Sequence, residues 1–168
     1  MMDISRRGNP RQALNDVYSE RLKPELILLP DELAVCRLGP ASPIPEWALA
    51  DAFCSATRTP QELSIVCPET RLPADCSGIR IERGFRAFQV EGPLDFALTG
   101  LLSSLLAPLA RAAIPVFVLS TFDTDLILVR SGQAQRAAVE LGRVAVVRRS
   151  RLRKPAGRRR SARRQPGG

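Results

Sequence analysis

The chain has 168 residues, 45% of them apolar, and a formal net charge of +8. No stretch reaches the roughly 20 uninterrupted apolar residues of a membrane span, which argues against a helical membrane protein. The chain contains no histidine and so lacks the side chain most often used for proton transfer near neutral pH. It also lacks a Gly-rich phosphate loop and a Gly-x-Ser-x-Gly nucleophile motif. We therefore expect a binding protein without a cofactor and not an enzyme.

Residues 1–22 are polar, show no clear period and lack the apolar middle of a signal peptide. They predict a flexible N-terminal arm and a cytoplasmic protein. Two apolar runs, 26–29 and 33–38, follow and are joined by Pro30-Asp31-Glu32, a pattern that predicts a β-hairpin.

The rest of the first half predicts shorter elements. Pro45 precedes a short helix over 46–53. A polar break at 57–60 leads into a strand over 62–67 that Pro68 ends. Residues 68–79 contain Pro, Asp and Gly and are typical of a loop.

The second half has the clearer pattern. A strand over 85–91 ends at Gly92-Pro93, and leucines then recur on one face of a helix, at Leu98, Leu101, Leu102, Leu105, Leu106 and Leu109. The apolar run 115–119 predicts a central strand covered on both sides. A strand over 126–129, a helix that begins after Ser131 and ends at Gly142, and a last strand over 144–147 complete the pattern.

This order of strand, helix, strand, strand, helix, strand is that of the ferredoxin-like fold. The sequence therefore predicts an α+β protein whose antiparallel sheets carry their helices on one face. We expect two such βαββαβ modules in tandem, over residues 23–82 and 83–147, followed by a basic tail over 148–168.

Several spaced blocks of the second half resemble the ACT domain family, the amino-acid-sensing regulatory modules built on this fold. The resemblance is to the branch with the eukaryotic cytosolic arginine sensor and small bacterial stand-alone ACT proteins, and it covers about 24–142. The blocks are Gly92-Pro93-Leu94-Asp95-Phe96, Thr99-Gly100-Leu101, Ala107-Pro108-Leu109-Ala110, Ile114-Pro115-Val116 and the stretch 119–129. In the first module, 59–66 is also similar to the family pattern.

The resemblance implies a regulatory protein that binds a free amino acid between modules, with two copies of this chain pairing to complete the cleft. The residues that it implies for the ligand site are Asp95, Phe96, Thr99, Gly100, Leu101, Pro115, Val116, Thr121, Phe122 and Asp125. Asp95 stands where the arginine sensor has a smaller residue, so the resemblance does not name the ligand.

Elementary chemistry gives these positions further roles. Amides at a helix start attract carboxylates, and Gly100 permits close approach to that helix. Asp125 can pair with an ammonium group and Thr121 can hydrogen-bond it. Two alternatives stay open: 123–125 is only a polar turn, and Asp95 only caps the helix. A metal held by Asp123 and Asp125 is disfavoured, because no further acid lies nearby in the sequence.

The four cysteines, at 36, 54, 67 and 76, form no Cys-x-x-Cys pair, and without histidine they do not predict a zinc site. Cys36 and Cys67 lie inside apolar strand patterns, where a buried thiol acts as a small hydrophobic residue. The alternative for these residues is a Cys67–Cys76 redox pair.

The positive charge belongs to one end of the chain. Residues 143–168 contain eleven Arg or Lys and no acid, whereas 1–142 contain fourteen basic and seventeen acidic residues. Such a tail cannot bury a core and is predicted to be disordered. Three interpretations stay open: a solvated tail, an accidental extension read past a frame shift, and a polyanion-binding tail that grips nucleic acid through its phosphates.

Overall fold

The computed structural model describes residues 23–49 and 53–150. The N-terminal arm and the tail from 151 onward lie outside these residues, so the predictions made for them, nucleic-acid binding included, stay predictions. The strands are β1 (Glu25–Leu28), β2 (Leu33–Leu38), β3 (Ser55–Arg58), β4 (Leu63–Pro68), β5 (Arg80–Val90), β6 (Phe117–Ser120), β7 (Asp125–Arg130) and β8 (Val146–Arg149). The helices are α2 (Glu46–Leu49), α3 (Leu101–Arg111) and α4 (Ala134–Leu141), with 3-10 turns at Glu69–Arg71 and Ser131–Gln133.

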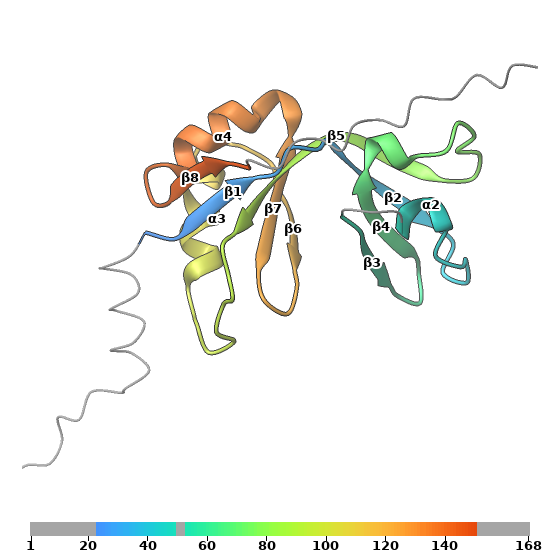
Figure 1. Cartoon of the computed structure of the whole chain (residues 1–168), viewed down its shortest axis with the longest axis horizontal. Helices are drawn as coiled ribbons and strands as arrows, with labels where there is room; N and C mark the ends of the chain where they lie inside the picture. Colours follow the sequence, from blue (N-terminus) through green and yellow to red (C-terminus); the bar gives the residue numbers. More distant parts are fainter. Residues whose placement is uncertain (1–22, 50–52, 151–168) are drawn as a thin grey trace, which may run out of the picture.

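One long strand, β5, holds the two halves of the molecule together. Its first residues pair with β2, and the residues from Phe85 onward pair with β7 and β1. The sheet therefore divides into two lobes, one around each end of β5 (Figure 1). The predicted module boundary at residue 82 falls inside this shared strand.

The second lobe, β5-α3-β6-β7-α4-β8, has the ferredoxin-like order. Its helices lie on one face of the sheet and share a core with it, which confirms the predicted fold class. The largest fully buried side chains of this core include Phe88, Leu105, Leu109 and Ile127. Strand β1 is inserted between β8 and β5, parallel to β8 and antiparallel to β5.

The first lobe, formed by β2, α2, β3, β4 and the start of β5, has the same strand order but only one short helix among its described residues. Residues 69–79, with their 3-10 turn, stand in place of a second helix. Its outer core contains Cys36, Ile65 and Cys67, covered by Ala48 and Trp47 from α2. A third core joins the lobes, because Leu33 and Val66 of the first pack in one cluster with Ala87, Leu126 and Leu128 of the second.

The predicted hairpin over 26–38 is wrong. Strand β1 pairs with β5 and β8, whereas β2 pairs with β4 and another part of β5. Residues 29–32 instead cross from one lobe to the other, held by the Leu29 amide on the Ala87 carbonyl at 2.9 Å. In this arrangement β1 forms hydrogen bonds on both of its edges, to β5 on one side and to β8 on the other.

Three other expectations need correction. The run 115–119 is not a central strand, because β6 pairs only with β7 and lies at an edge. The sequence does not predict strand β3, because its residues are mostly exposed and polar and overlap the predicted break at 57–60, yet this strand pairs with β4 along its whole length. Arg148 and Arg149, assigned to the tail, form the end of β8, where Arg148 pairs with Glu25 at 2.9 Å.

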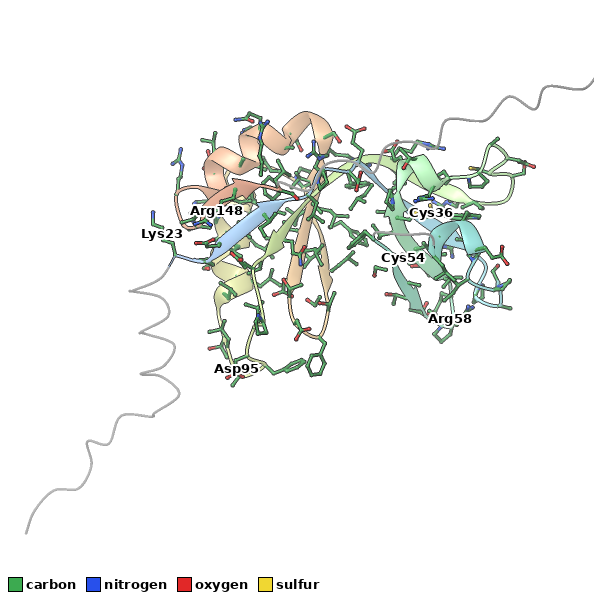
Figure 2. The ribbon with its side chains drawn as sticks, viewed as in Figure 1. Lys23, Cys36, Cys54, Arg58, Asp95 and Arg148 are labelled. Atoms are coloured by element: carbon green, nitrogen blue, oxygen red, sulfur yellow. The ribbon has the colours of Figure 1, made fainter. Side chains whose placement is uncertain are left out.

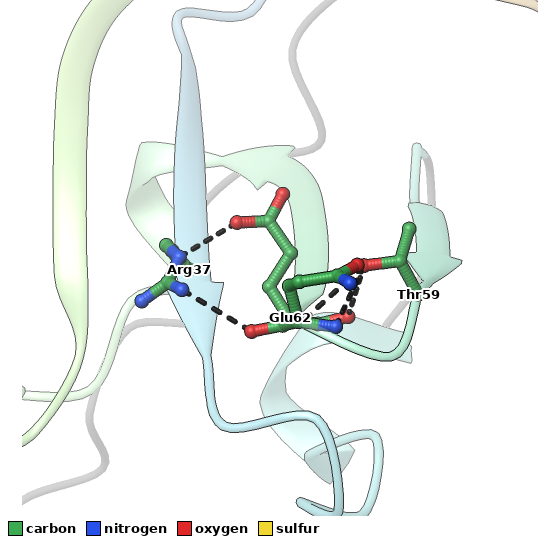
Figure 3. Close-up of polar contacts among 4 residues, drawn as sticks. Arg37, Thr59 and Glu62 are labelled. Carbon is green, nitrogen blue, oxygen red and sulfur yellow. Dashed lines mark hydrogen bonds and ion pairs between the residues drawn. The ribbon is translucent and has the colours of Figure 1, made fainter.

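The turn between β3 and β4 is closed by its own side chains (Figure 3). The Thr59 hydroxyl accepts hydrogen bonds from the amides of Gln61 and Glu62, each at 3.2 Å. Arg37 on β2 then pairs with the Glu62 carboxylate at 2.6 Å and donates to the Gln61 carbonyl at 3.2 Å. This exposed turn is therefore tied to the neighbouring strand.

Candidate functional site

The loop between β5 and α3 lies against the turn between β6 and β7 in the second lobe. The Leu94 amide donates to the Asp123 carbonyl at 2.8 Å, and the Thr124 hydroxyl donates to the Val90 carbonyl. Gly92 is required at this crossing, because a Cβ there would overlap the carbonyl oxygen of Asp123. Two segments about thirty residues apart in sequence are thus fixed side by side.

A hollow of about 310 Å³ lies between this loop, the turn and the start of α3. That volume is at the lower end of the range for small-molecule sites. Its lining consists of Leu94, Asp95, Phe96, Leu98, Gly100, Leu101, Leu102, Ser103, Ser120, Thr121, Phe122, Thr124 and Asp125.

One wall of the hollow is the N-terminus of α3. Gly100 caps this helix with a backbone φ of 83° and no side-chain hydrogen bond to the helix amides. The first amides of a helix have no acceptor within the helix and carry its positive dipole end. With Leu101, Leu102 and Ser103 lining the hollow, this wall is suited to a carboxylate.

The facing wall carries a carboxylate of its own. Asp125 begins β7 directly opposite Ser120 on β6, and the Ser120 hydroxyl donates to its Oδ1 at 2.5 Å. The Asp125 side chain is half-buried, and none of the ion pairs among the described residues involves it. A half-buried carboxylate at a hollow, opposite a helix N-terminus, is suited to a ligand's ammonium group.

The rim of the hollow is aromatic. The rings of Phe96 and Phe122 meet edge to face with centroids 5.0 Å apart and planes at 78°. They are nevertheless 75% and 77% exposed. Figure 2 shows Asp95, the neighbour of Phe96, at the tip of the second lobe. Large aromatic side chains left this open beside a hollow are typical of a surface that another molecule covers.

Comparison with known proteins then identifies the family. The family model of the ACT domain matches residues 80–141, which include the whole hollow, and a second model, of an N-terminal domain, matches 31–75. A protein of known crystal structure from Agobacterium tumefaciens is 35% identical, over 79% of this chain and 98% of its own, with a TM-score of 0.71. The chain belongs to the ACT domain family. No curated protein matched in the sequence search.

More distant structures share only the fold of this ACT protein. One is a protein of unknown function and possible transport protein from Vibrio cholerae, 20% identical over 73% of this chain and 91% of its own, with a TM-score of 0.59. Another is the allosteric aspartate kinase of Clostridium acetobutylicum, 11% identical over 67% of this chain and 33% of its own, with a TM-score of 0.52. ACT domains are regulatory rather than catalytic modules.

Seven of the ten residues predicted for the ligand site line the hollow of the ACT domain, namely Asp95, Phe96, Gly100, Leu101, Thr121, Phe122 and Asp125. Thr99, Pro115 and Val116 do not line it, and Val116 precedes the edge strand β6. Sequence reasoning missed Leu94, Leu98, Leu102, Ser103, Ser120 and Thr124. Whether any of these residues contacts a ligand stays a prediction.

Two side chains have roles that differ from those expected. Asp95 does not cap α3: its Oδ1 accepts from the Ala97 amide at 2.8 Å in a turn ahead of the helix. The Thr121 hydroxyl donates to the Thr124 carbonyl at 3.0 Å and accepts from the Thr124 amide at 3.2 Å. Thr121 therefore shapes the turn, and the predicted hydrogen bond between its hydroxyl and a ligand's ammonium group stays a prediction.

The described residues contain no group of three or more His, Cys, Asp or Glu side chains placed to hold one metal ion. No helix in the described part of the chain is both long and apolar enough to cross a membrane.

Proposed function

We propose that this chain is a regulatory sensor that binds one free amino acid in the hollow of its ACT domain. The observation that carries the proposal is the pairing of two opposite charges across one cavity. The start of α3 offers amides to the α-carboxylate, and Asp125 offers a carboxylate to the α-ammonium group. A zwitterion satisfies both walls, whereas a simple anion or cation satisfies one.

The hollow is open at its rim, and a second copy of the chain completes it. The exposed Phe96–Phe122 pair supports this part of the proposal, because its burial would close the rim and exclude water from the ligand's charges. The dimer is then the state that binds, and the ligand stabilises it by mass action.

Isothermal titration calorimetry with each of the twenty amino acids tests the proposal. We expect at least one to bind, and its methyl ester and its decarboxylated amine to bind much more weakly, because the α3 amides then have no carboxylate to receive. Silence across the panel at millimolar ligand would contradict the proposal.

The Asp125→Asn variant should lose affinity by about 10- to 100-fold, the usual contribution of one charge-assisted hydrogen bond. Asp123→Asn is the matched control. It removes the same charge from the same turn, but Asp123 does not line the hollow, so binding should be unchanged. Equal losses in the two variants would show that only the general charge of the turn matters.

A further inference from the structure

All four cysteines lie in the first lobe, away from the hollow, and Cys36, Cys54 and Cys67 are on or directly beside adjacent strands there. Strands β2 and β4 are antiparallel, with Cys36 opposite Ile65 and Ala34 opposite Cys67. Cys36 and Cys67 therefore lie two positions apart on adjacent strands and on the same face. Both are fully buried in the outer core of this lobe.

The two buried thiols contact each other. The Cys67 thiol donates a hydrogen bond to the sulfur of Cys36, and this bond lowers the pKa of Cys36 and raises that of Cys67. Burial raises the pKa of Cys36 and the positive charge of Arg83 lowers it, so the pKa stays below its usual value. Cys36 is therefore the better thiolate of the pair, with Cys67 in reach of its sulfur. The alternative Cys67–Cys76 pair is not formed in this structure: all four thiols are free, and Cys76 donates to the Pro73 carbonyl at 3.2 Å.

Cys54 connects this pair to solvent. It directly precedes β3, whose first residue, Ser55, lies opposite Val66 of β4, so Cys54 is next in register to Cys67. Phe53 packs into the core between the lobes, and the alternation of side chains along an extended segment turns Cys54 toward the outer face. Cys54 is exposed, and Figure 2 shows it in the same lobe as Cys36.

We propose that Cys36 and Cys67 are a redox site, which a hydroperoxide converts into a reversible disulfide across β2 and β4, with Cys54 as the thiol that meets the oxidant. In an antiparallel sheet such diagonal neighbours have Cα atoms about 7–8 Å apart, beyond the usual range of a disulfide, so β2 and β4 must move closer for the bond to form. A bond made there strains the strands and is easily reduced, which suits a switch better than a permanent crosslink.

The hydroperoxide forms the disulfide in three steps. Partial burial raises the pKa of the Cys54 thiol; the thiol loses its proton to solvent, and the thiolate attacks one peroxide oxygen. The O–O bond breaks, and the alkoxide or hydroxide that leaves takes up a proton to become an alcohol or water, giving a sulfenic acid on Cys54. The sulfur of Cys67 attacks that sulfur and expels hydroxide, which takes up the Cys67 proton as water. The Cys36 thiolate then attacks Cys67, the mixed disulfide breaks, and Cys54 leaves as a thiolate that is reprotonated.

Peptide mapping of the full chain after treatment with hydrogen peroxide tests this site. Arg37, Arg58 and Arg71 separate the four cysteines, so trypsin places each on its own peptide. We expect the Cys36 and Cys67 peptides joined, two hydrogens lighter than their sum, and released by dithiothreitol. Finding only Cys54 joined to another chain, or only sulfinic acid, would overturn the proposal.

Two variants test whether the oxidation proceeds through Cys54 and not through any thiol of the lobe. Cys54→Ser keeps the buried pair and should slow disulfide formation by about tenfold or more, because the exposed thiol meets the oxidant first. Cys76→Ser removes another thiol from the same lobe and should leave the rate unchanged. Equal rates in the Cys54→Ser variant and the unmodified chain would overturn the role of Cys54.

Discussion

The two lobes have the same strand order, yet their residues differ at one equivalent position, the end of the strand that begins the hairpin. In each lobe a Gly-Pro pair follows the first strand, at Gly39-Pro40 and Gly92-Pro93, and the next two strands form a hairpin. The last residue of β3, Arg58, pairs with Leu63, while the last residue of β6, Ser120, pairs with Asp125. The second lobe has a small polar residue and a carboxylate where the first has a guanidinium and a leucine.

This difference closes the first lobe and leaves the second open. The Arg58 guanidinium reaches across to the loop before α2, where it donates to the carbonyls of Pro40 and Ser42, the latter at 2.7 Å. Ser120 is too short to reach the corresponding loop, and the hollow lies in that space. One residue at a strand end thus distinguishes the loop contacts of the first lobe from the hollow of the second, and this difference is the basis for proposing one ligand site per chain.

The largest effect on ligand binding is expected when Ser120 is replaced by arginine, the residue at the equivalent position of the first lobe. Ser120→Arg places a guanidinium at the end of β6, where it can pair with Asp125 and fill the hollow as Arg58 fills its own lobe. Binding of the amino acid identified by calorimetry should fall by about 100-fold or more, since both space and charge are lost. Val139→Arg, at a 56% exposed position on α4 outside the hollow, is the control and should bind normally.

The next largest effect is expected on the stability of the protein, when Gly92 is replaced by alanine. Gly92→Ala forces a Cβ against the Asp123 carbonyl, and moving either backbone segment should cost about 2 kcal/mol or more of unfolding free energy. Gly132→Ala is the matched control, because a Cβ there has no neighbour within 4 Å. The midpoints of urea unfolding curves measure both, and equal midpoints would mean that the loop and turn are not held together.

The rim should affect assembly more than folding. Phe122→Ser removes one ring of the exposed pair and should raise the dimer dissociation constant by about tenfold or more, the usual effect of losing an aromatic anchor. Val139→Ser again removes an exposed apolar side chain elsewhere and should change little. Sedimentation equilibrium with and without ligand gives the constants. Equally small changes of the dissociation constant in Phe122→Ser and Val139→Ser would show that a second copy of the chain does not complete the site.

The smallest effect is expected in the first lobe. Arg58→Ala removes two hydrogen bonds from an exposed guanidinium, and because solvent screens it the loss should be about 1 kcal/mol or less. The amino-acid affinity of the second lobe should not change. A new second binding event in the calorimetric titration would show that Arg58 alone keeps the first lobe closed.

Much of the second lobe could be predicted from the sequence, because the patterns that indicate its elements are local. The leucine stripe of α3 and the Gly-Pro pair before it mark a helix and a loop, although α3 begins only at Leu101. The position of β1 was not predictable, since periodicity identifies a strand but not its neighbours. Ser120 has no chemical signature until the register of β6 and β7 sets it against Asp125. Arg58 was missed for the same reason, because its partners lie on another loop.

The central claim is that the hollow of the second lobe receives the charged groups of an amino acid. Two-dimensional ¹⁵N–¹H NMR during titration with that amino acid tests it most directly. We expect the largest shifts at the amides of Gly100, Leu101, Leu102 and Ser103, with the amides of Gly39 and Ser42 unchanged. Shifts confined to the first lobe, or none at saturating ligand, would contradict it.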